Sequence, residues 1–173
     1  GVFLIMFLKD EKKNKLGVII AGLGILFLGM NMMSDAMRGM RDSQAFINLI
    51  STLKNPILGV LVGTIFTAII QSSSASIGIL QALCVTGAVP FGTALPIIMG
   101  QNIGTCVTAI ISSIGTSKNA KRAAAVHLFF NIIGTAVFMI VFYTINAFMP
   151  FEFLNTPADA AGIATVHSLF NIG

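Results

Sequence analysis

A long segment without a charged side chain is the feature that most limits how this chain can fold. No Asp, Glu, Lys or Arg lies between Lys54 and Lys118, and charged residues make up only 9% of the 173 residues. Soluble domains usually carry about a quarter of charged residues. Because the chain is 55% hydrophobic with a mean hydropathy of +0.92, we expect an all-α integral membrane protein.

The other charges and the two cysteines rule against several classes of function. The net charge is +4, but the basic residues flank apolar segments without aromatic interleaving, so we expect no nucleic-acid partner. Cys84 and Cys106 lie inside apolar segments without metal-ligand spacing. They are expected to pack as small residues rather than to form a disulfide or a metal site.

The apolar segments predict a single membrane domain over residues 1–173. The polar region 34–55 fits an interfacial helix or a surface linker. Residues 1–8 are too few to span a membrane, and we expect the chain to be part of a longer protein. The predicted elements are a transmembrane helix over 16–34, a re-entrant hairpin over 56–89, a broken transmembrane helix over 91–114, a transmembrane helix over 121–146 and the start of a truncated transmembrane helix over 160–173.

The segment 56–89 has an unusual length for a membrane protein. It is too short for two crossings of about 20 residues each and too long for one. A re-entrant hairpin satisfies both limits and places the polar residues "QSSSAS", 71–76, at a turn near mid-membrane. Backbone outside a helix is tolerated there where protein shields it or where it lines an aqueous cavity. Gly59 and Gly63 are expected to let the two arms pack closely.

The distribution of charge favours the hairpin. If it returns to the side from which it entered, the basic segment "KDEKKNK", which begins at Lys9, and the basic loop at 118–122 lie on the same side. Glu152 and Asp159 then lie on the other side. Because basic loops are enriched on the cytoplasmic side, the basic segments are expected to be cytoplasmic.

A second interruption is predicted within 91–114. Pro96 is followed by "GQNIGT", residues 100–105, and a proline with nearby glycines favours a broken helix. Thr105 would then begin the following half-helix, with Gln101 and Asn102 at the break. Transporters recurrently build substrate and ion sites where broken or re-entrant helices converge.

The polar residues at these two interruptions are the candidate binding residues. A serine hydroxyl donates one hydrogen bond and also offers lone pairs, so a serine cluster can hold both an oxyanion and a hard cation such as sodium. A helix that begins after the turn adds free N–H groups. The candidates are Gln71, Ser72, Ser73, Ser74, Ser76, Gln101, Asn102 and Thr105.

The motif "AVHLFFNI" at 125–132 is echoed by "TVHSLFNI" at 165–172. His127 and Asn131 in the first copy are secondary candidates for ligand contact. For both His–Asn pairs, a hydrogen bond between helices is favoured over a ligand contact.

The stretches "QSSSA", "PIIMGQNIGTCVTAI" and "KRAAAVHLFFNIIGT", in this order, resemble the type II sodium-dependent phosphate cotransporters and their bacterial relatives, from about Leu16 to Gly173. Members of that family carry two QSSS repeats of inverted topology, whereas this chain has one and resembles the second-repeat half. The resemblance implies location in a cell membrane, such as a bacterial inner membrane, and a partner repeat from a missing half or a second copy. It also implies phosphate and sodium at Ser72, Ser73 and Ser74, with sodium ligands among Gln71, Ser73, Ser74, Asn102 and Thr105.

The sequence therefore predicts sodium-coupled secondary active transport of inorganic phosphate. Within the predicted spans, Lys and Arg occur only at the very start of 121–146, and none lies near mid-membrane to balance phosphate. Co-bound sodium must therefore supply the counter-charge where an isolated charge is costly. Transport of another small oxyanion and a non-transporting structural role stay open. An enzyme is not expected, because a hydrolase using His127 as base would lack both a G-x-S-x-G motif and an Asp within a span.

Overall fold

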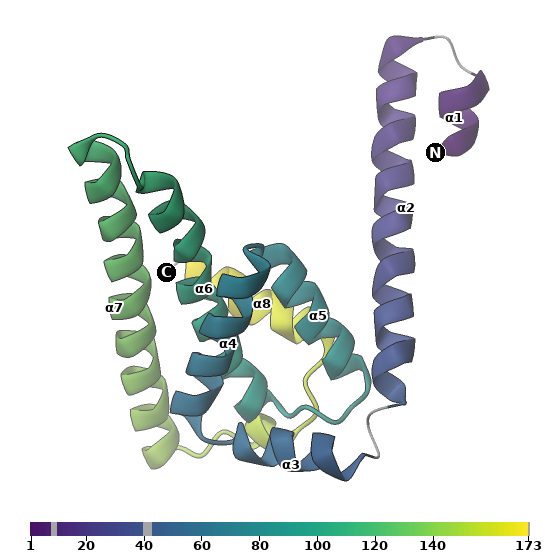
Figure 1. The fold of residues 1–173 in the computed structure, drawn as a ribbon. Coiled ribbons are helices and arrows are strands. Elements are labelled where there is room, and N and C mark those ends of the chain that lie inside the picture. The colour runs from purple at the N-terminus through teal and green to yellow at the C-terminus, as the bar shows by residue number, and fades with distance from the viewer. Residues whose placement is uncertain (8–9, 40–42, 173) are drawn as a thin grey trace.

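The computed structural model describes residues 1–7, 10–39 and 43–172, and this part of the chain contains helices but no strand (Figure 1). The predicted all-α class is confirmed. Lys9 and Gly173, which the predictions include, lie outside the described residues. The helices are α1 (Val2–Phe7), α2 (Glu11–Arg38), α3 (Gln44–Thr52), α4 (Pro56–Ile70), α5 (Ser73–Val85), α6 (Phe91–Ser113), α7 (Lys118–Phe148), the 3-10 helix η1 (Glu152–Asn155) and α8 (Ala160–Ile172).

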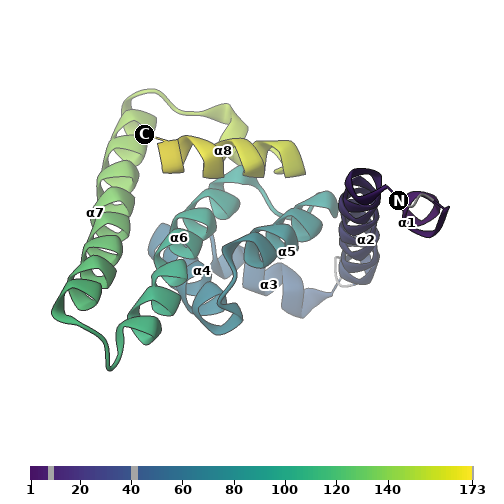
Figure 2. The same cartoon turned by 90° about the horizontal axis from the view of Figure 1, so that it is seen from above.

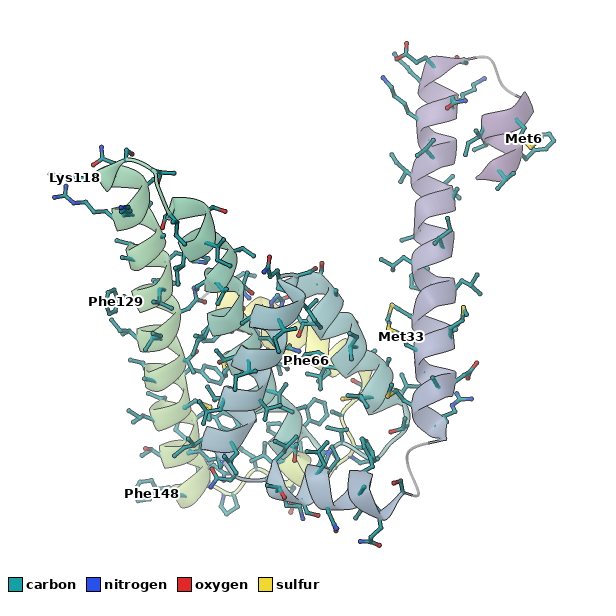
Figure 3. All side chains as sticks on the ribbon, viewed as in Figure 1. Met6, Met33, Phe66, Lys118, Phe129 and Phe148 are labelled. Atoms are coloured by element: carbon teal, nitrogen blue, oxygen red, sulfur yellow. The ribbon has the colours of Figure 1, made fainter. Side chains whose placement is uncertain are left out.

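The central helix of the bundle is α6. Seen from above (Figure 2), α4, α5, α7 and α8 surround it, while α2 stands beside α5 and carries α1 on its outer side. Three described helices, α2, α6 and α7, are long and apolar enough to cross a membrane, and α3 with α4 forms a fourth candidate bent by 110°. Most of α6 is buried, whereas α2 and α7 expose apolar side chains such as Phe129 and Phe148 (Figure 3). These exposed faces suit contact with lipid.

The helix α6 is continuous from Phe91 to Ser113, so the break predicted at residues 100–105 is wrong. Pro96 lies in the second turn of α6, where it removes one backbone hydrogen bond to Gly92 without ending the helix. The glycines of the motif serve another purpose, because Gly100 and Gly104 face α4.

The contact between α4 and α6 is made by small residues on both helices. A Cβ atom added to Gly63 would overlap the carbonyl oxygen of Ile97, and one added to Gly100 would overlap that of Val60. The glycines of α4 therefore pack against α6, and not against α5 as predicted. Glycines allow this close approach of two backbones inside a membrane bundle.

The helices α4 and α5 form a helical hairpin that enters and leaves at one end of the bundle. The helix α3 lies across that end, and the turn between α4 and α5 lies part-way along α7, short of the end that carries Lys118 (Figures 1 and 3). The start of α2, with Lys12 and Lys13, lies at the same end as Lys118, and η1 with Glu152 lies at the α3 end. The basic segments thus gather at one end, as the charge pattern predicted.

Candidate functional site

The turn of the hairpin brings two helix ends together. Gln71 adopts a left-handed conformation with φ 57° and ends α4, and its N–H donates to the carbonyl oxygen of Thr67 at 2.7 Å. Ser72 is extended and caps α5, with its Oγ accepting the N–H of Ala75 at 3.3 Å. Because α5 begins at Ser73, unpaired carbonyls of α4 and N–H groups of α5 meet within a few residues.

The hydroxyls of this turn are accessible. The Oγ atoms of Ser72 and Ser74 lie 3.4 Å apart. The side chain of Ser73 makes no hydrogen bond with any residue that the structure describes, and it is half-buried. Gln71 and Ser74 are exposed. The turn can therefore offer donors and acceptors to a ligand without breaking an internal contact of Ser73.

A buried polar cluster lies behind the turn. The Oγ1 of Thr67 in α4 and the Oγ of Ser76 in α5 are 2.7 Å apart. Gln101 in α6 donates from Nε2 to the Oγ of Ser76 at 2.8 Å and to its carbonyl oxygen at 3.1 Å. The three residues are at most 1% exposed. The cluster, Thr67–Ser76–Gln101, joins all three helices around the turn.

One oxygen atom of this cluster is free to bind a ligand. The Oε1 of Gln101 is buried and accepts no hydrogen bond from any described residue, which leaves an amide oxygen free for a proton donor or a hard cation. Sequence reasoning missed Thr67, because a single threonine in an apolar helix is typical of helix packing. Its position one helical turn before Gln71 was the available signal.

The other two candidates on α6 make their hydrogen bonds with residues outside the hairpin turn. Asn102 donates from Nδ2 to the carbonyl oxygen of Ile98 at 3.0 Å, and its Oδ1 accepts from Nδ2 of Asn171 in α8 at 3.3 Å. Thr105 donates to the carbonyl oxygen of Gln101 at 2.9 Å. Within the described residues, no hydrogen bond joins Asn102 or Thr105 to residues 71–76. The structure thus brings Ser76 and Gln101 into contact and turns Asn102 toward α8.

The two His–Asn motifs hold α6 from both sides. Asn171 bonds to Asn102 across helices, as was predicted for this type of residue. Asn131 donates from Nδ2 to the carbonyl oxygen of His127 within α7 at 2.9 Å. Its side chain also makes a hydrogen bond across helices, to the thiol of Cys106 in α6. Cys106 of α6 contacts the same carbonyl through Sγ at 3.6 Å. The side chain of His127 is exposed, so this motif contacts α6 through the backbone of His127 and the side chain of Asn131.

A family model described as Na+/Pi-cotransporter matches residues 29–156. The chain belongs to this family. The matched residues include the hairpin, the whole of α6 and α7, and the cluster Thr67–Ser76–Gln101. Asn171 lies beyond them. The resemblance inferred from the QSSS and GQNIGT motifs is therefore confirmed at the level of the family.

Two relatives of this Na+/Pi-cotransporter family member are informative. The uncharacterized protein YqeW of Bacillus subtilis (strain 168) is 31% identical over 173 residues, which cover 98% of the chain and 55% of YqeW. The human sodium-dependent phosphate transport protein 2B is 33% identical over 147 residues, which cover 75% of the chain and 21% of that protein. The chain thus spans about half the length of YqeW and about a fifth of the human protein. No solved structure matches it significantly.

Proposed function

We propose that this chain supplies the phosphate- and sodium-binding hairpin of a sodium-coupled secondary transporter for inorganic phosphate in a cell membrane. One observation carries the proposal. At the turn of the hairpin, the free hydroxyl of Ser73 and two helix ends lie in front of a buried cluster that keeps an unused amide oxygen on Gln101.

Phosphate would bind at the start of α5. The hydroxyls of Ser72, Ser73 and Ser74 donate hydrogen bonds to its oxygens, and the N–H groups in the first turn of α5 have no acceptor within the helix. The positive end of the helix dipole favours an anion at this position. The 13-residue length of α5 is sufficient for that effect.

Sodium would balance the charge of phosphate. The helices α4, α5 and α6 contain no Lys or Arg, and an uncompensated charge inside a membrane is expensive. The proposed oxygen ligands from the hairpin are those of Gln71, Ser73 and Ser74. From α6 they are the free oxygen of Gln101 and the side-chain oxygens of Asn102 and Thr105, residues typical of hard-cation ligands.

The lengths of the two arms support a site within the membrane. The 15 residues of α4 and the 13 residues of α5 correspond to about 22 Å and about 20 Å at the rise of an α-helix. Both values fall short of the hydrocarbon core, which is about 30 Å thick. A hairpin that enters at the α3 end would therefore turn before it reached the opposite surface.

A second QSSS-bearing unit would complete the site. Gln71 and Ser74 are exposed, whereas phosphate held by neutral groups needs an enclosed pocket. The outer face of α4 presents an apolar stripe that runs up to the turn. Its members Ile57, Leu61, Ile65 and Ile69 are 71%, 50%, 58% and 75% exposed. We infer that a second copy of this chain, or the other half of a longer protein, packs on this stripe.

Uptake of radiolabelled phosphate into proteoliposomes tests the proposal. We expect uptake by the full chain to need a sodium gradient and to be lost in Ser73→Ala. It should persist in the matched control Ser112→Ala, because Ser112 is exposed near the far end of α6. An excess of sulfate should leave uptake unchanged if the site selects phosphate.

Equilibrium binding of phosphate tests the site even if the chain alone binds phosphate without transporting it. Sodium should raise phosphate affinity relative to choline, with about one phosphate bound for every two chains if two copies form the site. Phosphate binding that is equal in sodium and in choline, or equal in Ser73→Ala and wild type, would contradict the proposal.

A further inference from the structure

A second polar cavity lies far from the hairpin turn, at the end of the bundle that α3 covers. Its volume is about 320 Å³. Phe46, Ile50 and Pro157 contribute apolar walls, and Ser51, Lys54 and Asn155 contribute polar side chains. None of these residues belongs to the QSSS turn or to the cluster behind it. We call this cavity the α3 pocket.

Three exposed side chains that carry hydrogen-bond donors line the α3 pocket without a partner among the described residues. Lys54 is the one charged residue among the described lining residues, and no carboxylate of the described chain lies within ion-pair distance of it. The side chains of Ser51 and Asn155 likewise form no hydrogen bond with described residues. An isolated cation beside a hydroxyl and an amide favours an anion with several acceptor oxygens.

The walls of the α3 pocket are fixed by backbone contacts. The α3–α4 corner is bent by 110° and is capped by Asn55, whose Oδ1 accepts the N–H of Ile57 at 3.0 Å. On the other side, the N–H of Ala158 donates to the carbonyl oxygen of Val89 at 2.9 Å, and the N–H of Phe91 donates to that of Thr156 at 3.1 Å. These bonds hold the segment that carries Asn155 beside the α5–α6 loop. The pocket is therefore formed before a ligand arrives.

The location of the α3 pocket near a membrane interface indicates which class of anion it could bind. The short helix α3 buries Phe46 and exposes Ile47 and Leu49, as expected of a helix that lies in a membrane interface. Phosphate groups are present at this level, in lipid headgroups and in solution. Lysine binds phosphate as a point charge, and the apolar walls suit the glycerol part of a headgroup.

We propose that the α3 pocket binds a phosphate group, held by Lys54 with Asn155 and Ser51, as a second anion site separate from the QSSS turn. The two sources of this group are an anionic phospholipid and free inorganic phosphate. The proposal does not depend on the function of the turn, because the two sites share no residue.

Two binding measurements on the full chain in maltoside detergent test this site. Native mass spectrometry counts bound phosphatidylglycerol, and equilibrium dialysis measures radiolabelled inorganic phosphate. Both use the Ser73→Ala background, so that binding at the turn does not contribute. Lys54→Met is compared with Lys118→Met, which removes an exposed lysine at the opposite end of the bundle.

We expect Lys54→Met to weaken binding about tenfold, in line with the loss of one charge-assisted hydrogen bond, and Lys118→Met to leave it unchanged. Asn155→Ala should weaken binding less. A lysine-dependent effect with the lipid alone assigns the pocket to a headgroup, and an effect with inorganic phosphate alone assigns it to the free anion. Equal binding by the Ser73→Ala parent and by the same parent carrying Lys54→Met in both measurements, or no binding of either ligand, would overturn the proposal.

Discussion

Ser73 and Ser76 are three residues apart in one motif, yet their surroundings differ. Ser73 is half-buried at the turn and its hydroxyl is free of hydrogen bonds to described residues. Ser76 is fully buried and is held by Thr67 and Gln101. The first serine is available to a ligand, whereas the second links three helices. Two serines of one motif thus have different roles, Ser73 in binding and Ser76 in helix packing.

Substitution of each serine by alanine should separate these roles. Ser73→Ala should abolish phosphate binding and leave the thermal unfolding midpoint unchanged. Ser76→Ala should lower the free energy of unfolding by about 1–3 kcal/mol, because it leaves buried groups of Gln101 and Thr67 without a partner. Thermal unfolding in detergent and phosphate binding, measured on the same samples, check both variants. Equal stability losses in the two variants would refute the distinction.

The hairpin could be predicted from two local properties of the sequence, a proline that starts a helix and the length of the apolar segment. Pro56 starts a helix, and an apolar segment of this length fits neither one crossing nor two. The role of Thr67 could not be predicted, because its partner Ser76 approaches it only when α5 folds back across the turn. Contacts across a turn depend on the angle between the helices, which no local pattern encodes.

Among the contacts between helices, the packing of α4 on α6 brings two backbones together most closely at glycines. Sequence patterns identified the glycines of both helices but not their partners. Gly63 and Gly100 are spaced for close packing on either neighbour, and their assignment to one interface follows from how the hairpin lies on α6. The same contact explains why GQNIGT stays helical, since unwinding it would open this interface.

Gly63→Ala should destabilise this interface, because the added methyl group meets the backbone of Ile97, which cannot move aside. We expect a loss of about 1–3 kcal/mol in the free energy of unfolding, the usual cost of overpacking. Gly78→Ala is the matched control in the other arm, since nothing lies within 4 Å of the added atom. That variant should be neutral or slightly stabilising, as expected for alanine in a helix. A Gly63→Ala variant as stable as Gly78→Ala would show that the two helices separate easily.

The two ends of the bundle differ in charge. Lys12, Lys13 and Lys118 lie at one end, and Glu152 lies at the α3 end. By the positive-inside rule, we expect the basic end to face the cytoplasm. In that orientation the α3 pocket would open on the outer side, and the hairpin would enter the membrane from that side.

Cysteine labelling tests this orientation without prior removal of native cysteines, because Cys84 and Cys106 are 2% and 0% exposed. Lys13→Cys and Lys118→Cys should react with a membrane-impermeant maleimide only in inside-out vesicles. Glu152→Cys should react in intact cells. If Lys118→Cys and Glu152→Cys were labelled from the same side, the arrangement of the hairpin described above would be wrong.

The backbone contact between α4 and α6 also limits how the bundle can move. Their backbones touch at Gly63 and Gly100, and the Oγ1 of Thr64 donates to the carbonyl oxygen of Gly100 across the same contact, so we expect α4 and α6 to move as one rigid body. We expect any motion to be taken up at the bent corner between α3 and α4 and at the turn at Gly115, which has φ +78°. If the chain transports phosphate as proposed, a crosslink between α4 and α6 should leave phosphate uptake intact, whereas one between α6 and α7 should abolish it.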